Sequence, residues 1–542
     1  MEHTQSDIEK PEYHSHEEFQ NRSRKLSEIR DLGIDPYPHK FPRTDPIRDL
    51  VKEYEDKEVG HSDDASAGKT PHVSAAGRLV LFRSMGKNAF GQIQGQTGRI
   101  QVMFNRDLTE IEGYQPDPSA NSDGPTPWKL LEKKLDLGDI LGVEGHLFHT
   151  NKGELTIFVK KLTLLCKTLL PLADKHCGLH DKETRYRKRW LDLISNEETH
   201  RIFEMRSRIF YLIRQFMMKE QFMEVETPVL QSVYGGADAQ PFETHLNALS
   251  QDMFMRISLE IPLKKLIVGG MHRIFEIGRV FRNEGIDRNH NPEFTMLEAY
   301  ASYWDYFDLM SLVENLFEHI ALDLYGSTKV PAKDPKSGLD IELDMKSPWP
   351  RLTLKEAIKK FGHLDVDQLS DEEMSNMLLQ SEHCAPEKLK TMNRGLFIAA
   401  LFEVFAEPYL IQPHHIIDHP IETTPLCKPH RNETDRLDGI VERFESFILG
   451  NEICNAYSEL NDPELQRSLL EQQALRREGG DPEACPLDEE FIESVCQGMP
   501  PTAGVGIGLD RMVMILANCH SIRDVLLFPW MKPQTEIEFH DN

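Results

Sequence analysis

Residues 273–300 read RIFEIGRVFRNEGIDRNHNPEFTMLEAY. Two runs within this stretch, residues 274–284 and 293–300, are rich in β-branched and aromatic residues and alternate in polarity. The segment between them, residues 285–292, consists of residues typical of turns and loops. The pattern therefore predicts two strands joined by a loop.

Side chains alternate between the two faces of a strand, so each predicted strand has a polar face and an apolar face. The polar faces predicted in this way comprise Glu276, Gly278, Arg282 and Glu284 on the first strand, and Phe294, Glu298 and Tyr300 on the second. An arginine, an aromatic ring and several carboxylates on one surface suit an anionic group, a flat ring and a cation. From the pattern alone, a half-buried hairpin with a solvated polar face is the favoured reading.

The composition is that of a soluble globular protein of 542 residues, enough for about two or three domains. No apolar run is long enough to span a membrane, and the polar, acidic N-terminus is unlike a secretory signal. The eight cysteines are scattered without a C-x-x-C pair, which argues against structural zinc and a disulfide framework and favours the reducing cytoplasm.

The formal net charge of -27 argues against general binding of nucleic acid, because phosphate contacts need Lys and Arg. The local balance differs, since residues 67–172 contain 13 Lys and Arg against 10 Asp and Glu. The basic run at residues 185–189 either meets nucleic-acid phosphate or belongs to a solvated linker.

A β pattern begins at His72 and predicts five strands with a helical stretch between the third and the fourth. The predicted strands span residues 73–82, 89–94, 99–104, 140–148 and 154–165. This order indicates an OB barrel, a fold that binds single-stranded nucleic acid with stacked aromatic side chains and a basic rim. Arg83, Phe90 and Gln101 suit that task. By composition alone, however, a core position for Phe90 and a plain surface position for Gln101 are favoured.

A second polar block lies in residues 443–462, RFESFILGNEICNAYSELND. Alternation places Asn455, Tyr457 and Glu459 on one face of a strand. Glu445 and Glu452 add carboxylates, which are ligands that Mg²⁺ takes together with nucleotide phosphates. Strict alternation puts Glu452 on the face opposite Glu459, so either a bulge or twist redirects it or the metal assignment is wrong.

The third block, residues 504–516, reads GVGIGLDRMVMIL. Gly504, Gly506 and Gly508 occupy one strand face, so a flat ligand could lie against bare backbone. Asp510 is expected to cap the helix that follows, with Arg511 in its first turn. The spacing is neither that of the dinucleotide-binding G-x-G-x-x-G motif nor that of a P-loop.

These blocks together resemble the class II aminoacyl-tRNA synthetases. FRNEG followed by HNPEF resembles motif 2 in its lysyl form, residues 198–230 resemble motif 1, and residues 504–516 resemble motif 3. MGKNAFGQIQ and GRIQVMF resemble the anticodon-binding barrel of class IIb. The resemblance covers about residues 67–529 and points to the lysyl-tRNA synthetases.

The resemblance implies an α+β fold, in which an N-terminal OB-fold β-barrel precedes an antiparallel-sheet catalytic domain flanked by helices. The expected parts are a disordered or helical extension (1–66), the anticodon-binding barrel (67–172), a linker (173–197) and the catalytic domain (198–542), with an insertion at about 326–350. Motif 1 would form a homodimer interface, although a core helix fits its pattern equally well.

The implied activity is ATP-dependent attachment of L-lysine to tRNA(Lys) through lysyl-adenylate, with release of AMP and diphosphate. Arg282 and Arg511 would be catalytic, and Glu445 and Glu452 would bind Mg²⁺. ATP would be bound by Arg282, Glu284, His290, Phe294, Glu445 and Arg511. Lysine would be bound by Gly236, Glu260, Arg282, Glu298, Tyr300, Asn455, Tyr457, Glu459 and Gly506. The anticodon would meet Arg83, Phe90, Gln101 and Glu154.

Two alternatives remain at this point. A synthetase paralogue that lysylates a protein would lack the anticodon barrel, whereas this sequence contains the pattern of one. A catalytically inactive RNA-binding protein would be expected to have lost one of Arg282, Arg511, Glu445 and Glu452, and all four are present.

Overall fold

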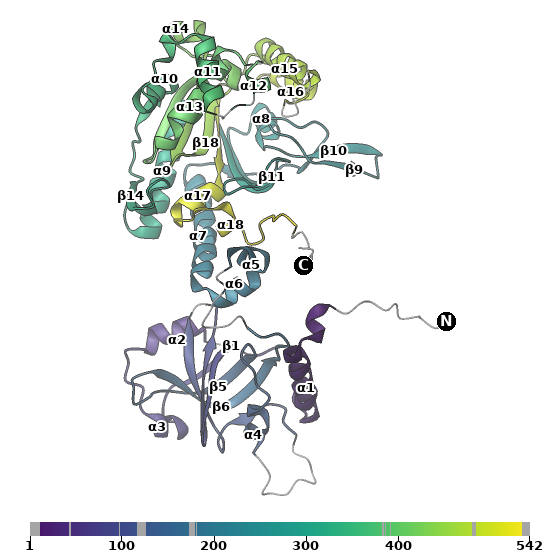
Figure 1. Ribbon diagram of the computed structural model, residues 1–542, viewed down its shortest axis with the longest axis vertical. Helices are drawn as coiled ribbons and strands as arrows, with labels where there is room; N and C mark the ends of the chain where they lie inside the picture. The colour runs from purple at the N-terminus through teal and green to yellow at the C-terminus, as the bar shows by residue number, and fades with distance from the viewer. Residues whose placement is uncertain are drawn as a thin grey trace, which may run out of the picture. The chain divides into compact units, whose positions relative to one another are not determined.

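The computed structural model describes residues 11–42, 45–96, 98–115, 126–172, 179, 181–381, 384, 386–390, 392–479 and 484–533 (Figure 1). The chain divides into two compact units, residues 1–200 and 201–542. The expected disordered or helical extension (1–66) falls in part on residues 1–10, outside the described residues. The described part that follows begins with two helical segments, Glu12–Ser15 and Glu17–Asp31.

The first unit is built on a closed β-barrel. Its sheet has the order β3-β2-β1-β5-β6-β4, and an additional pairing of β3 with β6 closes it. The strands are β1 (His72–Met85), β2 (Asn88–Gln94), β3 (Arg99–Asn105), β4 (Glu110–Ile111), β5 (Ile140–His149) and β6 (Leu155–Cys166). The five predicted strands and the helix after the third, α4 (Pro127–Glu132), are therefore confirmed, and the barrel is an OB fold.

Alternating apolar residues of the barrel strands point inward and form one core. Trp128 of α4 plugs it, since its ring stacks on Phe104 at a centroid distance of 4.5 Å. Two helices before the barrel, α1 (Glu17–Asp31) and α2 (Ile47–Tyr54), add Ile29, Ile47 and Leu50 to the same core. The N-terminal extension is thus part of the barrel's hydrophobic core.

A buried arginine fastens α1 to the barrel. Arg22 is 4 % exposed, and its Nη1 donates to Thr168 Oγ1 and to the carbonyl oxygens of Leu137 and Leu170. Because three acceptors share this buried donor, removal of the side chain leaves them without it.

We expect Arg22→Ala to lower the free energy of unfolding by about 2 kcal/mol, because three partly buried acceptors lose their hydrogen bonds to a charged donor. Arg24→Ala is the matched control, since Arg24 lies on the same helix with its side chain 71 % exposed and should change stability by less than about 0.5 kcal/mol. Urea unfolding followed by circular dichroism measures both. Equal midpoints for the two variants would contradict the role given to Arg22.

The basic run at residues 185–189 is neutralised within the first unit. It lies in α5 (Lys182–Arg187) and α6 (Arg189–Ser195). Arg185 and Arg189 both pair with buried Asp192, each at 2.7 Å, and Arg187 pairs with Glu183. These arginines have internal partners, which argues against the phosphate-binding reading, and the segment is helical and ion-paired instead of the plain solvated linker of the other reading. Part of the predicted linker, residues 173–178 and 180, lies outside the described residues.

The second unit is organised around an eight-stranded sheet of order β15-β16-β17-β18-β19-β12-β11-β7, antiparallel except for its two edge pairs. Its strands are β7 (Met223–Glu224), β11 (Arg273–Phe281), β12 (Glu293–Ser302), β15 (Arg351–Thr353), β16 (His414–Pro420), β17 (Ile440–Ile448), β18 (Asn451–Ser458) and β19 (Thr502–Gly508). A small sheet contains β8 (Leu230–Gln231), β9 (Glu243–Leu246) and β10 (Gln251–Met255).

Helices flank this sheet (Figure 1). They are α7 (Glu197–Lys219), α8 (Glu260–Val268), α9 (Tyr306–Tyr325), α10 (Leu354–Ala357), α11 (Asp371–Gln380), α12 (Pro386–Leu389), α13 (Arg394–Phe405), α14 (Glu433–Leu437), α15 (Pro463–Glu478), α16 (Glu489–Cys496), α17 (Leu509–Leu516) and α18 (Ile522–Val525). The first unit also contains α3 (Ser62–Ser66). The arrangement confirms an α+β fold with an antiparallel catalytic sheet.

The largest core lies between this sheet and α9. Asp305 caps α9 by accepting hydrogen bonds from two backbone N–H groups, and helical spacing then turns Leu309, Val313 and Phe317 toward the sheet. The expected insertion at 326–350 contains a hairpin, β13 (Lys329–Lys333) and β14 (Asp340–Asp344), which adds Val330 to this core. The opposite face of the sheet remains free to line a cavity.

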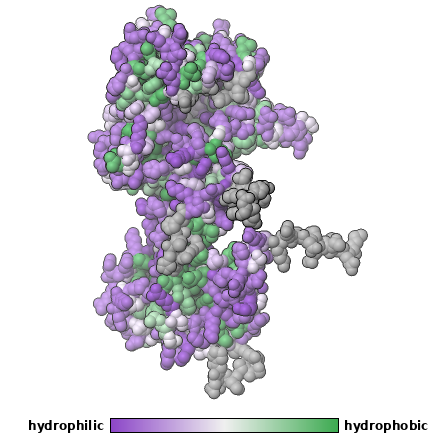
Figure 2. All heavy atoms as spheres, viewed as in Figure 1, coloured by the Kyte–Doolittle hydropathy of each residue, from purple (hydrophilic) through white to green (hydrophobic). Residues whose placement is uncertain are grey.

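The visible surface of both units is largely hydrophilic, with scattered apolar side chains (Figure 2). Among the described residues, no helix combines the length and the apolar character that crossing a membrane requires. The described cysteines are all free thiols.

Candidate functional site

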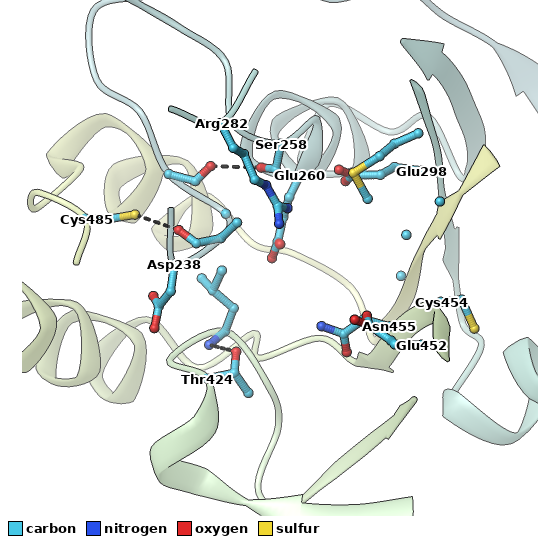
Figure 3. A pocket seen from close by; sticks show the side chains of 18 of the residues that line it. Asp238, Ser258, Glu260, Arg282, Glu298, Thr424, Glu452, Cys454, Asn455 and Cys485 are labelled. Atoms are coloured by element: carbon cyan, nitrogen blue, oxygen red, sulfur yellow. Dashed lines mark hydrogen bonds between the residues drawn. The ribbon is translucent and has the colours of Figure 1, made fainter. Parts of the chain in front are cut away.

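A cavity of about 420 Å³ opens on the face of the sheet away from α9, a volume typical of small-molecule sites. It is lined by β12, β18 and β19, by the segment after β11, by the start of α8 and by the loop at residues 234–238. Figure 3 shows Arg282 pointing into it, with Asp238 and Cys485 to one side and Glu298, Asn455 and Glu452 to the other. The three predicted polar blocks thus meet at one site.

Arg282 stands just beyond the end of β11. The strand ends at Phe281, three residues before the predicted end, so Arg282 and Glu284 belong to the loop. The Arg282 guanidinium lies over the Phe294 ring, 5.2 Å from its centroid, and Nε donates to the Ile257 carbonyl oxygen at 3.4 Å. An aromatic ring and a fixed cation therefore face the cavity together.

The prediction that Glu276 shares this polar surface is wrong. Glu276 is 2 % exposed, pairs with Arg256 at 2.7 Å, and accepts hydrogen bonds from Thr227. Its carboxylate is used to join β11 to the segment after β7, because a buried charge needs a partner. It is absent from the cavity lining.

One end of the cavity is acidic. Glu298 accepts hydrogen bonds from the Leu259 N–H at 2.8 Å and from the Tyr300 hydroxyl at 3.0 Å. Glu260 accepts a hydrogen bond from the Tyr457 hydroxyl, 2.8 Å from each of its oxygens. Burial raises the pKa of Glu298 to about 7, and the nearby Glu260 carboxylate adds to this shift. Such an end favours a cationic ligand.

Glu459 lies behind this acidic end rather than in the cavity lining. It is 1 % exposed, and one of its oxygens contacts the ammonium of Lys264, which also contacts Glu260 at 2.5 Å. The sequence prediction had both Glu298 and Glu459 facing the ligand directly. The structure brings the two glutamates to the same end but gives Glu459 a cationic partner of its own.

Two glycines keep this end open. Gly236 has a φ of +89°, and a Cβ there would lie 2.1 Å from Ser258 Oγ, so both its conformation and its space require glycine. A Cβ on Gly504 would lie 2.2 Å from Glu459 Oε1 and 2.3 Å from the Tyr300 ring. Gly504, Gly506 and Gly508 all line the cavity, which confirms the predicted bare strand face.

A β-bulge brings Glu452 to the same face as Glu445. The pairing of β17 with β18 runs from Glu445–Asn455 to Ser446–Cys454 and then to Phe447–Glu452, so Ile453 is an extra residue. Both carboxylates consequently line the cavity. Of the two readings left open by strict alternation, the bulge is the one that the structure contains.

Each of these two carboxylates has an arginine as a neighbour. Arg443 pairs with Glu445 and donates through Nε to Asn455 Oδ1 at 3.0 Å. Burial raises the pKa of Glu445, and the Arg443 guanidinium opposes the shift. Arg511 donates to the Glu452 carbonyl oxygen at 2.6 Å and lies 3.4 Å from its carboxylate.

The cavity lining also contains the remaining residues that were predicted to bind the nucleotide. Glu284 lines the cavity, and so does His290, whose Nε2 lies 3.5 Å from Arg511 Nη2. His290 Nδ1 is held by Asp287 at 2.8 Å. The loop between β11 and β12 is thus tied to the start of α17.

Asp510 has a different role from the predicted one. The N-cap of α17 is Gly508, and Asp510 lies inside the helix. Its carboxylate accepts a hydrogen bond from the Thr295 N–H at 2.7 Å and pairs with Arg206 of α7 at 2.6 Å. It fixes α17 to β12 and α7 because these partners face it across the core.

Sequence reasoning missed two charged residues at this site, Lys264 and Arg443. Lys264 follows Glu260 by four residues, the spacing that stacks side chains on one helix face. Arg443 precedes Glu445 by two residues on one strand face. Both signals were present, but each is also common on solvated surfaces.

Among the described residues, no cluster of three or more His, Cys, Asp or Glu side chains is arranged to hold a metal ion by itself. Two carboxylates facing one cavity, Glu445 and Glu452, nevertheless suit Mg²⁺, which commonly binds through one or two carboxylates plus substrate phosphates. The donor set therefore fits a metal ion that arrives with a nucleotide.

In the barrel, the four predicted anticodon residues lie on neighbouring strands or beside them. Phe90 pairs with Arg83 across β1 and β2 and packs, half-buried, against a small core cluster. Gln101 donates to Glu154 at 2.6 Å and accepts from Thr156 at 2.8 Å. Phe90 is thus neither fully core nor freely exposed, and Arg83 and Glu154 are exposed.

Comparison with known protein families gives two matches. Residues 181–532 match the class II tRNA synthetases (D, K and N), and residues 73–165 match the OB-fold nucleic acid binding domain.

Curated relatives span nearly the whole chain. A lysine–tRNA ligase of Chlamydia caviae is 56 % identical over 525 residues, which cover 96 % of this chain and 98 % of the relative. The enzyme of that name from Chlamydia pneumoniae is 54 % identical, with the same coverage. That of Methanoculleus marisnigri is 44 % identical over 94 % of each chain. The chain therefore belongs to the class II tRNA synthetases of the D, K and N group and, within it, to the lysine–tRNA ligase family.

Proposed function

We propose that this protein joins L-lysine to tRNA(Lys) in two steps, using ATP and passing through lysyl-adenylate. The observation that carries the proposal is a single cavity with a cation over an aromatic ring at its centre and buried carboxylates at one end. Such a cavity accepts a nucleotide on the ring and an ammonium group at the acidic end. The family membership supports the same conclusion.

In the first step, a carboxylate oxygen of lysine attacks the α-phosphorus of ATP. The new bond joins this oxygen to phosphorus, and the bond from the α-phosphorus to the bridging oxygen breaks, releasing diphosphate. Both reactants are anionic, so Arg282 would hold them together, since its planar fork can contact carboxylate and phosphate at once. No general base is needed, because positioning and electrostatics lower the barrier.

The ATP end of the cavity would be formed by the predicted nucleotide residues. Phe294 would stack on the adenine, and Arg511 would contact the far phosphates or cover the other face of the ring. Glu284 and His290 would border the nucleotide. Glu445 and Glu452 would hold Mg²⁺, which when bound neutralises phosphate charge and orients the leaving diphosphate.

The lysine end would select its substrate by charge. Glu298, with Tyr300 beside it, would receive the side-chain ammonium, and Glu459 would contribute from behind. Glu260 and the Gly236 backbone would receive the α-ammonium, and Asn455, Tyr457 and Gly506 would border the substrate. A neutral or acidic side chain would leave buried carboxylates unpaired, which is costly.

In the second step, a ribose hydroxyl of tRNA attacks the adenylate carbonyl carbon, and AMP leaves. The anticodon would contact Arg83, Phe90, Gln101 and Glu154, and Phe90 would stack on a base.

We also propose a homodimer through α7 and β7, where Tyr211, Met218 and Met223 are exposed. The expected location is the cytoplasm.

The function is tested by ATP–pyrophosphate exchange with each of the twenty amino acids, with and without tRNA. Lysine alone is expected to support exchange without tRNA, and the protein should then aminoacylate tRNA(Lys). Exchange driven by aspartate or asparagine would overturn the assignment of the acidic end while leaving the fold intact. A folded protein with Mg²⁺ present but no exchange would overturn the activity itself.

A steric series along β19 tests where lysine lies. Gly504→Ala should reduce kcat/KM for lysine by about 1–3 kcal/mol, because its methyl group overlaps Glu459 and Tyr300. At Gly508 the nearest atoms to an added Cβ are 3.9 Å away, so Gly508→Ala should leave the lysine KM unchanged. Steady-state exchange kinetics compare the two, and equal lysine KM values would place the amino acid elsewhere.

A further inference from the structure

We infer that Lys264 is a positioning residue for amino-acid recognition, because its ammonium holds both Glu260, which lines the cavity, and Glu459, which lies behind it. This inference rests on the proposed function. Lys264 does not line the cavity and would never touch the substrate. It would act through the two glutamates.

The contacts described for the Lys264 ammonium are two glutamates and two aromatic rings. Its side chain is fully buried, and Nζ lies 2.5 Å from Glu260 Oε1 and in contact with Glu459 Oε2. The ammonium also lies 5.5 Å from the centre of the Tyr457 ring and 5.9 Å from that of Phe491. Helical spacing on α8 places Lys264 one turn after Glu260, where the two side chains meet.

The Glu459 carboxylate has fewer donors than that of Glu260 and therefore relies more on Lys264 for its stabilisation. Glu260 also receives the Tyr457 hydroxyl, whereas the Glu459 oxygens accept no hydrogen bond from any other group in the described part of the chain. Burial by itself lowers the pKa of Lys264, but the two carboxylates that touch it outweigh this and raise it. Burial raises the pKa of Glu459, and the Lys264 ammonium opposes that shift.

The charges at this end match the proposed substrate. When all three are ionised, the carboxylates Glu260, Glu298 and Glu459 outnumber the cations Lys264 and Arg282 by one negative charge. Free lysine at neutral pH has two ammonium groups and one carboxylate, an excess of one positive charge. Without Lys264 the excess would double in a buried place, and a carboxylate would instead take up a proton.

The groups that face Glu459 come from several elements. They are Glu260 and Lys264 of α8, Glu298 and Tyr300 of β12, Tyr457 of β18, Gly504 of β19 and the thiol of Cys427. Lys264 is the one cation in this set. A proton held between Glu260 and Glu459 in its absence would have to leave before an ammonium group could bind.

The test is Lys264→Met, with Lys265→Met as the matched control. Lys265 is the next residue of the same helix, is half-buried, and pairs with Glu490 at 3.0 Å outside the cavity. In ATP–pyrophosphate exchange, Lys264→Met should raise the lysine KM roughly a hundredfold while the ATP KM stays within about twofold. Between pH 7.5 and 8.5 the variant's lysine KM should fall as pH rises, whereas the wild type and Lys265→Met should stay level.

Each outcome decides the inference. An unchanged lysine KM in Lys264→Met overturns it, and so does a loss confined to kcat without a pH slope. Lys264→Arg retains the charge and should restore part of the affinity and remove the slope. If Lys264→Met, Lys264→Gln and Lys264→Arg all fail to fold by circular dichroism, Lys264 is structural and the inference is wrong. Failure of the wild type to exchange with lysine would instead overturn the proposed function.

Discussion

Arg282→Ala is expected to reduce lysine-dependent ATP–pyrophosphate exchange by about a thousandfold or more, the scale seen when a preorganised cation or donor is removed from a transition state. The physical reason is that two anions must meet at the α-phosphorus. Arg282 is the cation placed over Phe294 at the centre of the cavity. Alanine leaves their repulsion uncompensated.

Arg279→Ala is the matched control for this prediction. Arg279 lies three residues earlier on β11, has a half-exposed side chain, and pairs with Glu293 at 3.5 Å. Exchange rates for this variant should stay within about twofold of wild type, since exposed ion pairs contribute little. Arg282→Lys keeps the charge but loses the planar fork, so its rate should lie between the two. Comparable rates for Arg279→Ala and Arg282→Ala would remove Arg282 from the reaction.

Glu298→Gln is expected to reduce kcat/KM for lysine by about 2–5 kcal/mol, the cost of removing one partner of a buried charge pair. The loss should appear mainly in the lysine KM, with the ATP KM within about twofold. Glu293→Gln on the same strand is the control, because Glu293 is half-exposed and pairs only with Arg279 among the partners described for it. A Glu298→Gln enzyme with the wild-type lysine KM would show that the side-chain ammonium lies elsewhere.

The same residue sets a pH dependence. The pKa of Glu298 in the free protein is raised to about 7, so below pH 7 the carboxyl group is mostly neutral. An ammonium ligand binds the ionised form, and binding at low pH must therefore release a proton. We expect the lysine KM to rise about tenfold between pH 8 and pH 6 in the wild type, and this slope to disappear in Glu298→Gln.

Much of the fold could be predicted from local pattern. The barrel strands alternate regularly, and the β11–β12 pair is separated by an unmistakable loop, so both follow from side-chain periodicity. The cavity residues on regular strands, such as Asn455, Tyr457 and the three glycines, were also placed on the right face. Periodicity works where the backbone is regular.

The rest depended on contacts between distant segments. Nothing near Glu276 in the sequence indicates that Arg256 would bury it, and nothing near Asp510 indicates Arg206. The ion pair between Lys264 and Glu459 joins residues almost two hundred positions apart. The spacing of Glu260 and Lys264 predicts only the other ion pair of this lysine. The local sequence around a charged residue does not predict which distant residue it will pair with inside the fold.

The extra residue in β18 makes the site depend on the register of its strands as well as on side-chain chemistry. If Ile453 were taken into the regular ladder instead of bulging out, strict alternation would turn Glu452 away from Glu445, toward the packed side of the sheet. A substitution elsewhere that flattened the bulge could thus silence the protein with every predicted functional side chain still present in its sequence. Sequence inspection for missing functional residues would score such a chain as intact.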